Sequence, residues 1–93
     1  MRRLRGRWMN KACDPVLEFL ADHDIAVPIG VLDNELEPSY PTIDRATTKL
    51  EERGFIEKDD QYESFWRITD RGKGYLDGDV DASKFEHIED GEE

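Results

Sequence analysis

Only one cysteine, Cys13, occurs among the 93 residues, so no disulfide can form within the chain, and this usage fits a reducing compartment. No apolar run approaches the roughly 18 residues that a membrane span needs, so no membrane partner is expected. The first seven residues are basic, but no apolar segment follows them, and we expect neither a secretory nor a twin-arginine signal. The length allows one hydrophobic core. Together these absences predict a small cytoplasmic protein of one domain.

Residue patterns typical of catalysis are equally scarce. No Ser-His-Asp or Cys-His constellation, glycine-rich phosphate loop or paired-carboxylate cleft can be argued, so we expect no enzyme, no cofactor and no small-molecule ligand. His23 lies between two aspartates, but no second histidine lies at ligand spacing, so we expect no metal site. Cys13 is expected to be a small buried residue rather than a redox switch.

Lysine is also scarce, whereas acids are abundant. Five lysines and eight arginines face 23 acids, which gives a net charge of −10. Bulk electrostatics therefore disfavours nucleic-acid binding. The same composition is typical of proteins from a salty cytoplasm, where at about 1 M ionic strength the screening length is near 3 Å. The net charge is weak evidence against DNA binding if the cell is saline.

Charge and apolar content divide the chain into three segments. Residues 1–9 form a basic arm that holds four arginines, and residues 10–78 hold 17 of the 21 Leu, Ile, Val and Phe side chains. The middle segment is therefore the predicted domain. Residues 79–93 are acidic and are expected to form a flexible, solvated tail. The few apolar residues of this tail are either incidental or dock it on a partner, and the sequence leaves this open.

Proline, glycine and capping residues predict the order of elements within the domain. The expected elements are a helix from Asn10 or Asp14 to about residue 23, a strand stub over 25–27, a helix from Pro28 to about residue 36, a helix over 39–53, strands over 55–58 and 65–68, and a helix over 69–76. Ser39 is the expected cap of the third helix, and Gly54 suits its left-handed end. The polar residues 59–64 predict a hairpin tip.

The helix over residues 39–53 carries the clearest functional pattern. At about 100° per residue, Arg45, Lys49 and Arg53 form a basic stripe within a sector of about 80° that contains no acid. Such a helix fits the DNA major groove, where Arg and Lys donate to guanine edges and phosphates. The alternative is a solvated face whose bases pair with nearby acids. A short preceding helix, a tight turn and a following hairpin favour a recognition helix.

Two stretches resemble winged helix-turn-helix regulators. Residues 42–57 are similar to their recognition helix and first wing strand, and residues 66–72 are similar to the second wing strand and its exit. Residues 8–9 and 75–78 further resemble small haloarchaeal regulators related to the halophage phi-H repressor. The resemblance covers about residues 8–80. It implies an α+β winged helix-turn-helix fold, with a three-helix core, a two-stranded β-hairpin wing and a short C-terminal helix.

The resemblance also implies a function. It predicts a transcription regulator, expected to be a repressor, of a halophilic archaeon or its phage. The protein would bind double-stranded DNA as a homodimer, with helix 39–53 in the major groove. The positions that match the contact residues are Ser39, Tyr40, Thr42, Arg45, Thr48 and Lys49.

Further candidate contacts lie outside these matched positions. Arg53 continues the basic stripe, and Arg67 could reach a phosphate from the second wing strand. The arm either follows a minor groove or stays solvated, and both options remain open. Its basic residues are Arg2, Arg3, Arg5 and Arg7.

The predicted wing departs from those of DNA-binding relatives. Residues 59–64 include three acids, which would repel phosphates, so we assign no binding role to the tip. The acidic wing supports an alternative function. The chain would then be a winged-helix protein-interaction module or DNA mimic that engages a basic partner through its wing and tail.

Overall fold

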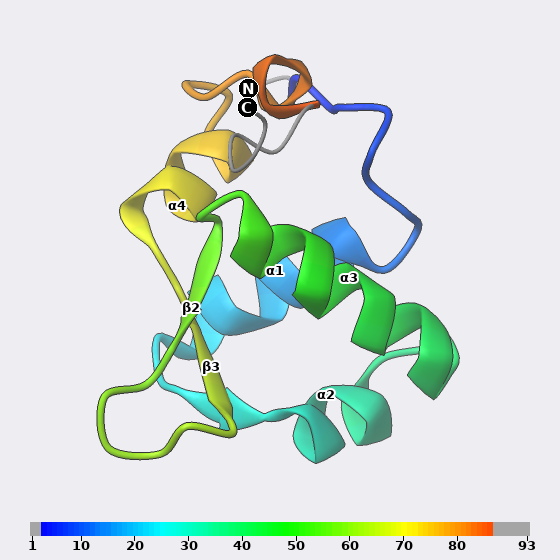
Figure 1. Cartoon of the computed structure of the whole chain (residues 1–93), viewed down its shortest axis with the longest axis vertical. Helices are drawn as coiled ribbons and strands as arrows, with labels where there is room; N and C mark the ends of the chain where they lie inside the picture. Colours follow the sequence, from blue (N-terminus) through cyan, green and yellow to red (C-terminus); the bar gives the residue numbers. More distant parts are fainter. Residues whose placement is uncertain (1–2, 87–93) are drawn as a thin grey trace.

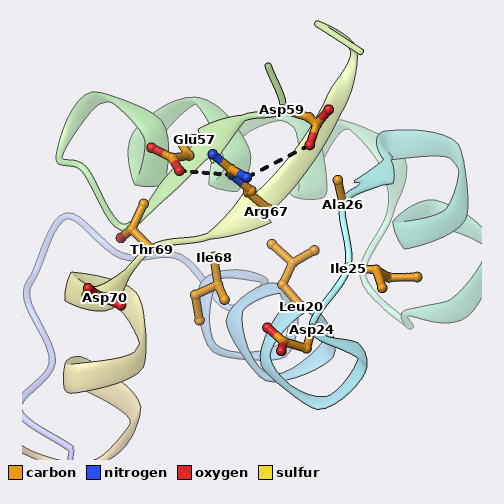
Figure 2. Close-up of a pocket in the computed structure, with 10 residues that line it drawn as sticks. All are labelled: Leu20, Asp24, Ile25, Ala26, Glu57, Asp59, Arg67, Ile68, Thr69 and Asp70. Carbon is orange, nitrogen blue, oxygen red and sulfur yellow. Dashed lines mark hydrogen bonds and ion pairs between the residues drawn. The ribbon is translucent and has the colours of Figure 1, made fainter. Parts of the chain in front are cut away.

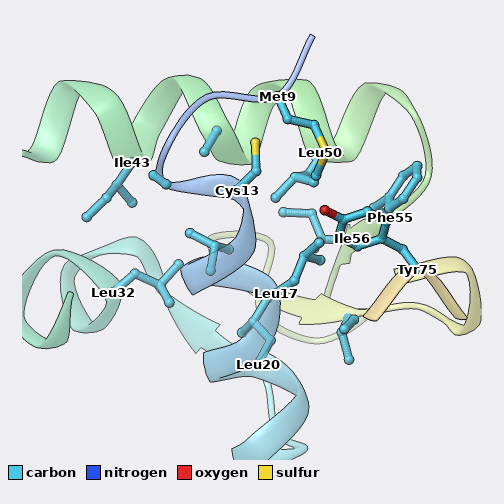
Figure 3. Packing of buried hydrophobic residues seen from close by; sticks show 14 of the residues in the cluster. Met9, Cys13, Leu17, Leu20, Leu32, Ile43, Leu50, Phe55, Ile56 and Tyr75 are labelled. Carbon is cyan, nitrogen blue, oxygen red and sulfur yellow. The ribbon is translucent and has the colours of Figure 1, made fainter. Parts of the chain in front are cut away.

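The structure is a computed structural model that describes residues 3–86. Helix α1 (Cys13–His23) lies at its centre. Figure 1 shows it crossing behind α3 (Tyr40–Glu52), and Figure 3 shows buried side chains of both helices packed together. Helix α1 also contacts β3 (Phe65–Ile68) and α4 (Asp70–Leu76). Apolar residues at helical spacing form its buried side. They are Cys13, Val16, Leu17 and Leu20.

The helix-turn-helix unit consists of α2 (Ile29–Glu35) and α3. The helix predicted to start at Pro28 begins one residue later, with Pro28 at its N-cap position, and Leu32 is its buried residue. Ser39 occupies the predicted N-cap position of α3. Its hydroxyl lies 3.0 Å from the Thr42 hydroxyl, however, and accepts no backbone hydrogen bond.

A three-stranded antiparallel sheet with the order β1-β3-β2 follows (Figure 1). Strands β2 (Ile56–Lys58) and β3 form the predicted hairpin wing. The strand stub predicted over residues 25–27 lies one to two residues later, as β1 (Val27–Pro28). It pairs with β3 and makes the sheet one strand larger than the expected two-stranded wing. The α+β winged helix-turn-helix fold is confirmed.

Two predicted helix ends have the expected geometry. Gly54, just after α3, has a φ of 79°, which a side chain would strain. Thr69 caps α4, because its hydroxyl accepts the N–H of Gly72 at 3.2 Å. The start of α1 differs slightly from either expected residue. The helix begins at Cys13, and the Asn10 carboxamide oxygen accepts the N–H of Ala12 in the preceding turn at 2.9 Å.

The two chain segments that were expected to form an arm and a tail pack together on the domain. The N-terminal segment meets the 3-10 helix η1 (Ala82–Phe85) through a bridge between Leu4 and Asp81. Trp8 is buried and donates from its indole nitrogen to the Ala82 carbonyl at 2.8 Å. Residues 79–86 of the predicted tail thus lie against the domain, and residues 87–93 of that tail lie outside the described residues. Val80, Ala82 and Phe85 pack in or against the core, an effect that the high average charge conceals.

Candidate nucleic-acid interface

Helix α3 presents its outer side to solvent because its inner side is part of the core. The inner residues, each at most 1% exposed, are Ile43, Ala46, Thr47 and Leu50. On the outer side, Tyr40, Arg45 and Thr48 are exposed, while Thr42 and Lys49 lie half-buried at the border. All six residues that match the contact pattern therefore lie on this helix or, for Ser39, at its N-cap.

The first turn of α3 is polar and is held in place from outside the helix. The Asn10 amide nitrogen donates to the Thr42 carbonyl at 3.1 Å, which ties this turn to the segment before α1. Ser39 and Thr42 place two hydroxyls side by side, and Tyr40 is 47% exposed. Hydroxyls at a helix N-terminus are suitable donors to phosphate oxygens.

The three bases of the predicted stripe lie in different environments. Arg45 is exposed, and none of the ion pairs found among residues 3–86 involves Arg45 or Lys49. Arg53, in contrast, keeps only 9% of its side chain exposed. Its guanidinium lies over the Trp8 ring, 4.4 Å from the centroid, and donates to the Phe85 carbonyl at 2.7 Å. Arg53 thus serves the packing of the chain ends, and the structure does not present it to a ligand.

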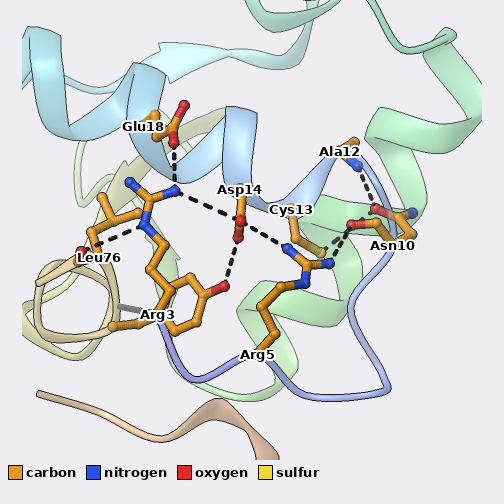
Figure 4. A network of polar contacts seen from close by, with 9 residues as sticks. Arg3, Arg5, Asn10, Ala12, Cys13, Asp14, Glu18 and Leu76 are labelled. Atoms are coloured by element: carbon orange, nitrogen blue, oxygen red, sulfur yellow. Dashed lines mark hydrogen bonds and ion pairs between the residues drawn. The ribbon is translucent and has the colours of Figure 1, made fainter. Parts of the chain in front are cut away.

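Two arginines of the predicted arm, Arg3 and Arg5, pair with acids of α1 (Figure 4). Arg3 pairs with Glu18, and Arg5 pairs with Asp14 at 2.7 Å. Arg7 is exposed, and its backbone N–H donates to the Glu86 carboxylate at 2.6 Å. Arg2, also a predicted contact, lies outside the described residues.

Asp14 also accepts a hydrogen bond from the Tyr75 hydroxyl at 2.7 Å, so one carboxylate joins the arm, α1 and α4 (Figure 4). Burial raises the pKa of Tyr75, and the hydrogen bond to Asp14 raises it further. The phenol therefore remains a donor, and the network contributes to the fold rather than to a ligand site.

Arg67 lies on β3 beside a cavity of about 500 Å³ (Figure 2). Its guanidinium pairs with Glu57 at 2.9 Å and lies 4.0 Å from Asp59. The Asp59 carboxylate also accepts the N–H of Gln61 at 2.9 Å, which shapes the wing tip. Wing acids have therefore already engaged the cation that was predicted to reach a phosphate from this strand.

A groove of about 470 Å³ runs between α3 and the wing, and it is predominantly acidic. Asp44 and Glu51 line it from α3 and Glu63 from the wing, whereas Lys58 is the one base among its lining residues. The ammonium group of Lys58 lies 5.7 Å from the centroid of the Trp66 ring. Duplex phosphates would be repelled along this side of α3.

Lys11 is a further candidate contact that the sequence analysis does not include. This exposed lysine directly follows Asn10, whose amide is bonded to the first turn of α3. Lys11 and α3 lie about 30 positions apart in the chain, so no helical spacing could associate them. Helical spacing relates bases within one helix, and it gives no information about a base from another segment of the chain.

The comparisons with known proteins agree with this architecture. A family model described as a winged helix-turn-helix phage repressor matches residues 1–88. The crystal structure of the PhiH1 repressor-like protein from Haloarcula marismortui is similar, with a TM-score of 0.78 and 26% identity over 90% of this chain and 94% of that one. No curated protein matches the sequence. Within the described residues, no helix is long and apolar enough to cross a bilayer, and no cluster of three or more potential metal ligands occurs.

Proposed function

This chain belongs to the winged helix-turn-helix phage repressor family, and on that premise we propose that it is a sequence-specific, duplex-DNA-binding transcription regulator that acts as a repressor. In this proposal α3 enters the major groove. The outer side of this helix carries the argument, because Arg45 and Thr48 are exposed there and follow a polar first turn. Arg45 has no ion-pair partner among residues 3–86, so it is available to donate to a guanine edge.

The remaining contacts follow from position along the helix. Ser39, Tyr40 and Thr42 at the N-terminal turn would hold phosphate oxygens, and Lys49 would contact a phosphate from the border of the helix. Arg53 has no place in this interface, because its guanidinium is buried against Trp8. We also leave out three described arginines, because each already forms an ion pair with an acid of α1 or of the wing. They are Arg3, Arg5 and Arg67.

We propose that this regulator belongs to a halophilic archaeon or its phage and acts in the cytoplasm of the archaeal cell. The net charge of −10 supports this origin, and so does the similar protein from Haloarcula marismortui. We also propose that it binds as a homodimer, because one small module contacts few base pairs and a two-fold pair doubles that number. At molar salt, direct hydrogen bonds rather than net charge would provide the binding energy.

Selection of bound sequences from random duplex DNA at molar salt tests the proposal. Enrichment of a palindrome is the expected result, and the double variant Arg45→Ala with Lys49→Ala should then lose binding while remaining folded. A matched control is Lys73→Ala with Lys84→Ala, which removes the same charge from α4 and η1. A wild-type protein that enriches no sequence, or a double variant with unchanged affinity, would overturn the assignment.

The acidic groove between α3 and the wing favours a second candidate, a protein-interaction module or DNA mimic. In this case duplex DNA would not bind at any salt concentration, and a basic protein partner would. Deletion of the whole tail is a poor test, because Ala82 is fully buried and Phe85 packs on the core. Neutralisation of the exposed wing acids by Asp60→Asn and Glu63→Gln is the better variant, and it should abolish capture of the basic partner.

A further inference from the structure

The two flanks of α3 differ in charge. On the wing flank, Asp44, Glu51 and Glu63 share a groove with one base, Lys58. The ammonium group of Lys58, a residue of the wing strand β2, lies over the Trp66 ring of the neighbouring strand β3. A strand of phosphates on this flank would face a surplus of two negative charges, from three acids and one base.

The opposite flank is formed by the segment before α1, and bases gather there around Asn10. The Asn10 amide nitrogen donates to Thr42 of α3, and the Asn10 carbonyl lies 3.5 Å from the Arg5 guanidinium (Figure 4). Lys11 follows directly and is exposed. Lys11 lines a groove with residues 35–38, the turn that leads into α3, so a base from outside α3 lies near the start of that helix.

Lys49 belongs to the same flank, because it follows Thr42, the residue bonded to Asn10, by two turns of α3. Its side chain is half-buried there, and its carbonyl accepts a hydrogen bond from Arg53, whose guanidinium lies over Trp8 of the N-terminal segment. Arg5 is neutralised by Asp14, which leaves Lys11 and Lys49 as the bases of this flank without an ion pair among residues 3–86.

We propose that the phosphates of bound duplex DNA follow the N-terminal flank of α3, where Lys11 and Lys49 contact them, and that the wing flank takes no part in phosphate binding. This orientation rests on the proposed function and adds Lys11 to it. Glu35 and Glu37 share a groove with Lys11, and neither forms an ion pair with it. Their potential weakens the contribution of Lys11, so Lys49 should have the larger effect of the two.

Single neutral variants test this orientation on a duplex selected with the wild-type protein. Lys11→Gln and Lys49→Gln should each weaken binding by a factor that does not depend on the DNA sequence, and this factor should be larger for Lys49→Gln. Each should also reduce the slope of log K against log salt by about 1, which is the loss of one phosphate contact. Lys58→Gln is the matched control from the wing flank: it loses no phosphate contact, so its slope should not fall by about 1, and only a small long-range change in affinity at low salt is expected. Equal slopes for Lys11→Gln, Lys49→Gln and wild type would overturn the proposal, and so would a slope reduced by about 1 for Lys58→Gln.

Photo-crosslinking provides an independent readout of position. Cys13 is fully buried, so Lys11→Cys and Lys58→Cys each create one accessible thiol for a thiol-reactive crosslinker. Crosslinks to the selected duplex are expected from position 11 and not from position 58, with wild type as the labelling control. The reverse pattern overturns the orientation and leaves the proposed function intact. If the wild-type protein binds no duplex, both fail together, and that failure is visible before any variant is made.

Discussion

The guanidinium of Arg53 lies over the ring of Trp8, 4.4 Å from its centroid, and so joins the end of α3 to both terminal segments. The same group donates to the carbonyls of Phe85 and Glu86. Trp8 in turn contacts Phe55 edge-on, with ring centroids 5.4 Å apart. A cation at the end of the recognition helix therefore contributes to the core, whereas Arg45, two turns earlier, faces solvent.

Arg53→Ala should destabilise the fold, and Arg45→Ala should not. The first change removes a partly buried cation–π contact and hydrogen bonds to carbonyls, with an expected loss of about 2 kcal/mol in the free energy of unfolding. The second removes the same charge from an exposed position, and a change within about 0.5 kcal/mol is expected. Urea unfolding at one fixed salt concentration measures both. Equal stability of the two variants would show that the contacts of Arg53 contribute nothing.

DNA binding should separate the same pair in the opposite sense. Arg45→Ala is expected to lose affinity for the selected duplex, by about 1–3 kcal/mol if it contacts a guanine edge. Arg53→Ala should keep wild-type affinity under conditions in which the variant is fully folded. Fluorescence anisotropy with a labelled duplex measures both. A loss of affinity in folded Arg53→Ala would return that residue to the interface.

Two glycines in helices should respond oppositely to alanine. A Cβ at Gly72 would clash with the Phe55 carbonyl and lie 2.7 Å from a carbon of Ile68, so Gly72→Ala should cost about 1–3 kcal/mol. A Cβ at Gly30 in α2 would meet nothing within 4 Å, and Gly30→Ala should stabilise by about 0.5–1 kcal/mol. Thermal unfolding followed by circular dichroism compares them. A stabilised Gly72→Ala variant would show that α4 can move away from β2 and β3 without cost.

Tyr75 should make stability depend on alkaline pH. Because the pKa of Tyr75 is raised in the folded state, the folded protein holds this proton more tightly than the unfolded chain. Its contribution is therefore complete below about pH 10 and is lost as the pH rises above the ordinary tyrosine range. Tyr75→Phe, which lacks the hydrogen bond to Asp14, should be about 1 kcal/mol less stable than wild type at neutral pH. This gap should narrow above about pH 10 in urea unfolding, and a constant gap would contradict the assignment.

Local sequence patterns predicted the helices and strands well, because interactions between residues close in the chain determine where these elements begin and end. Ser39 and Gly54 bracket α3, which spans Tyr40–Glu52, and Thr69 caps α4 with its hydroxyl. Capping and left-handed ends depend on residues within one turn of the helix. The hairpin followed similarly from two short apolar runs around a polar tip.

Long-range packing could not be predicted in this way. Leu4 and Asp81 form a bridge between segments that separately look charged and solvated. Arg53 shares the helical spacing of Arg45 and Lys49, and its different environment arises from a tryptophan 45 positions earlier in the chain. Helical spacing therefore predicts that the three bases lie on one helix, and the fold determines which of them remain available.

Neutralising the wing should strengthen DNA binding at low salt and leave it unchanged at molar salt. Glu63 is exposed and lines the acidic groove beside α3, so Glu63→Gln removes a charge that repels phosphates. In water, one unit charge about 10 Å away is worth near 0.4 kcal/mol, or roughly a twofold change in affinity. Screening over about 3 Å at 1 M salt should abolish this gain. Anisotropy titrations at molar salt and at the lowest salt that keeps the protein folded would measure the difference. Asp77→Asn, at the exposed end of α4, is the matched control and should show no gain at either salt concentration. A gain for Glu63→Gln that persists at molar salt would place this side chain in direct contact with the duplex, contrary to the orientation proposed for α3.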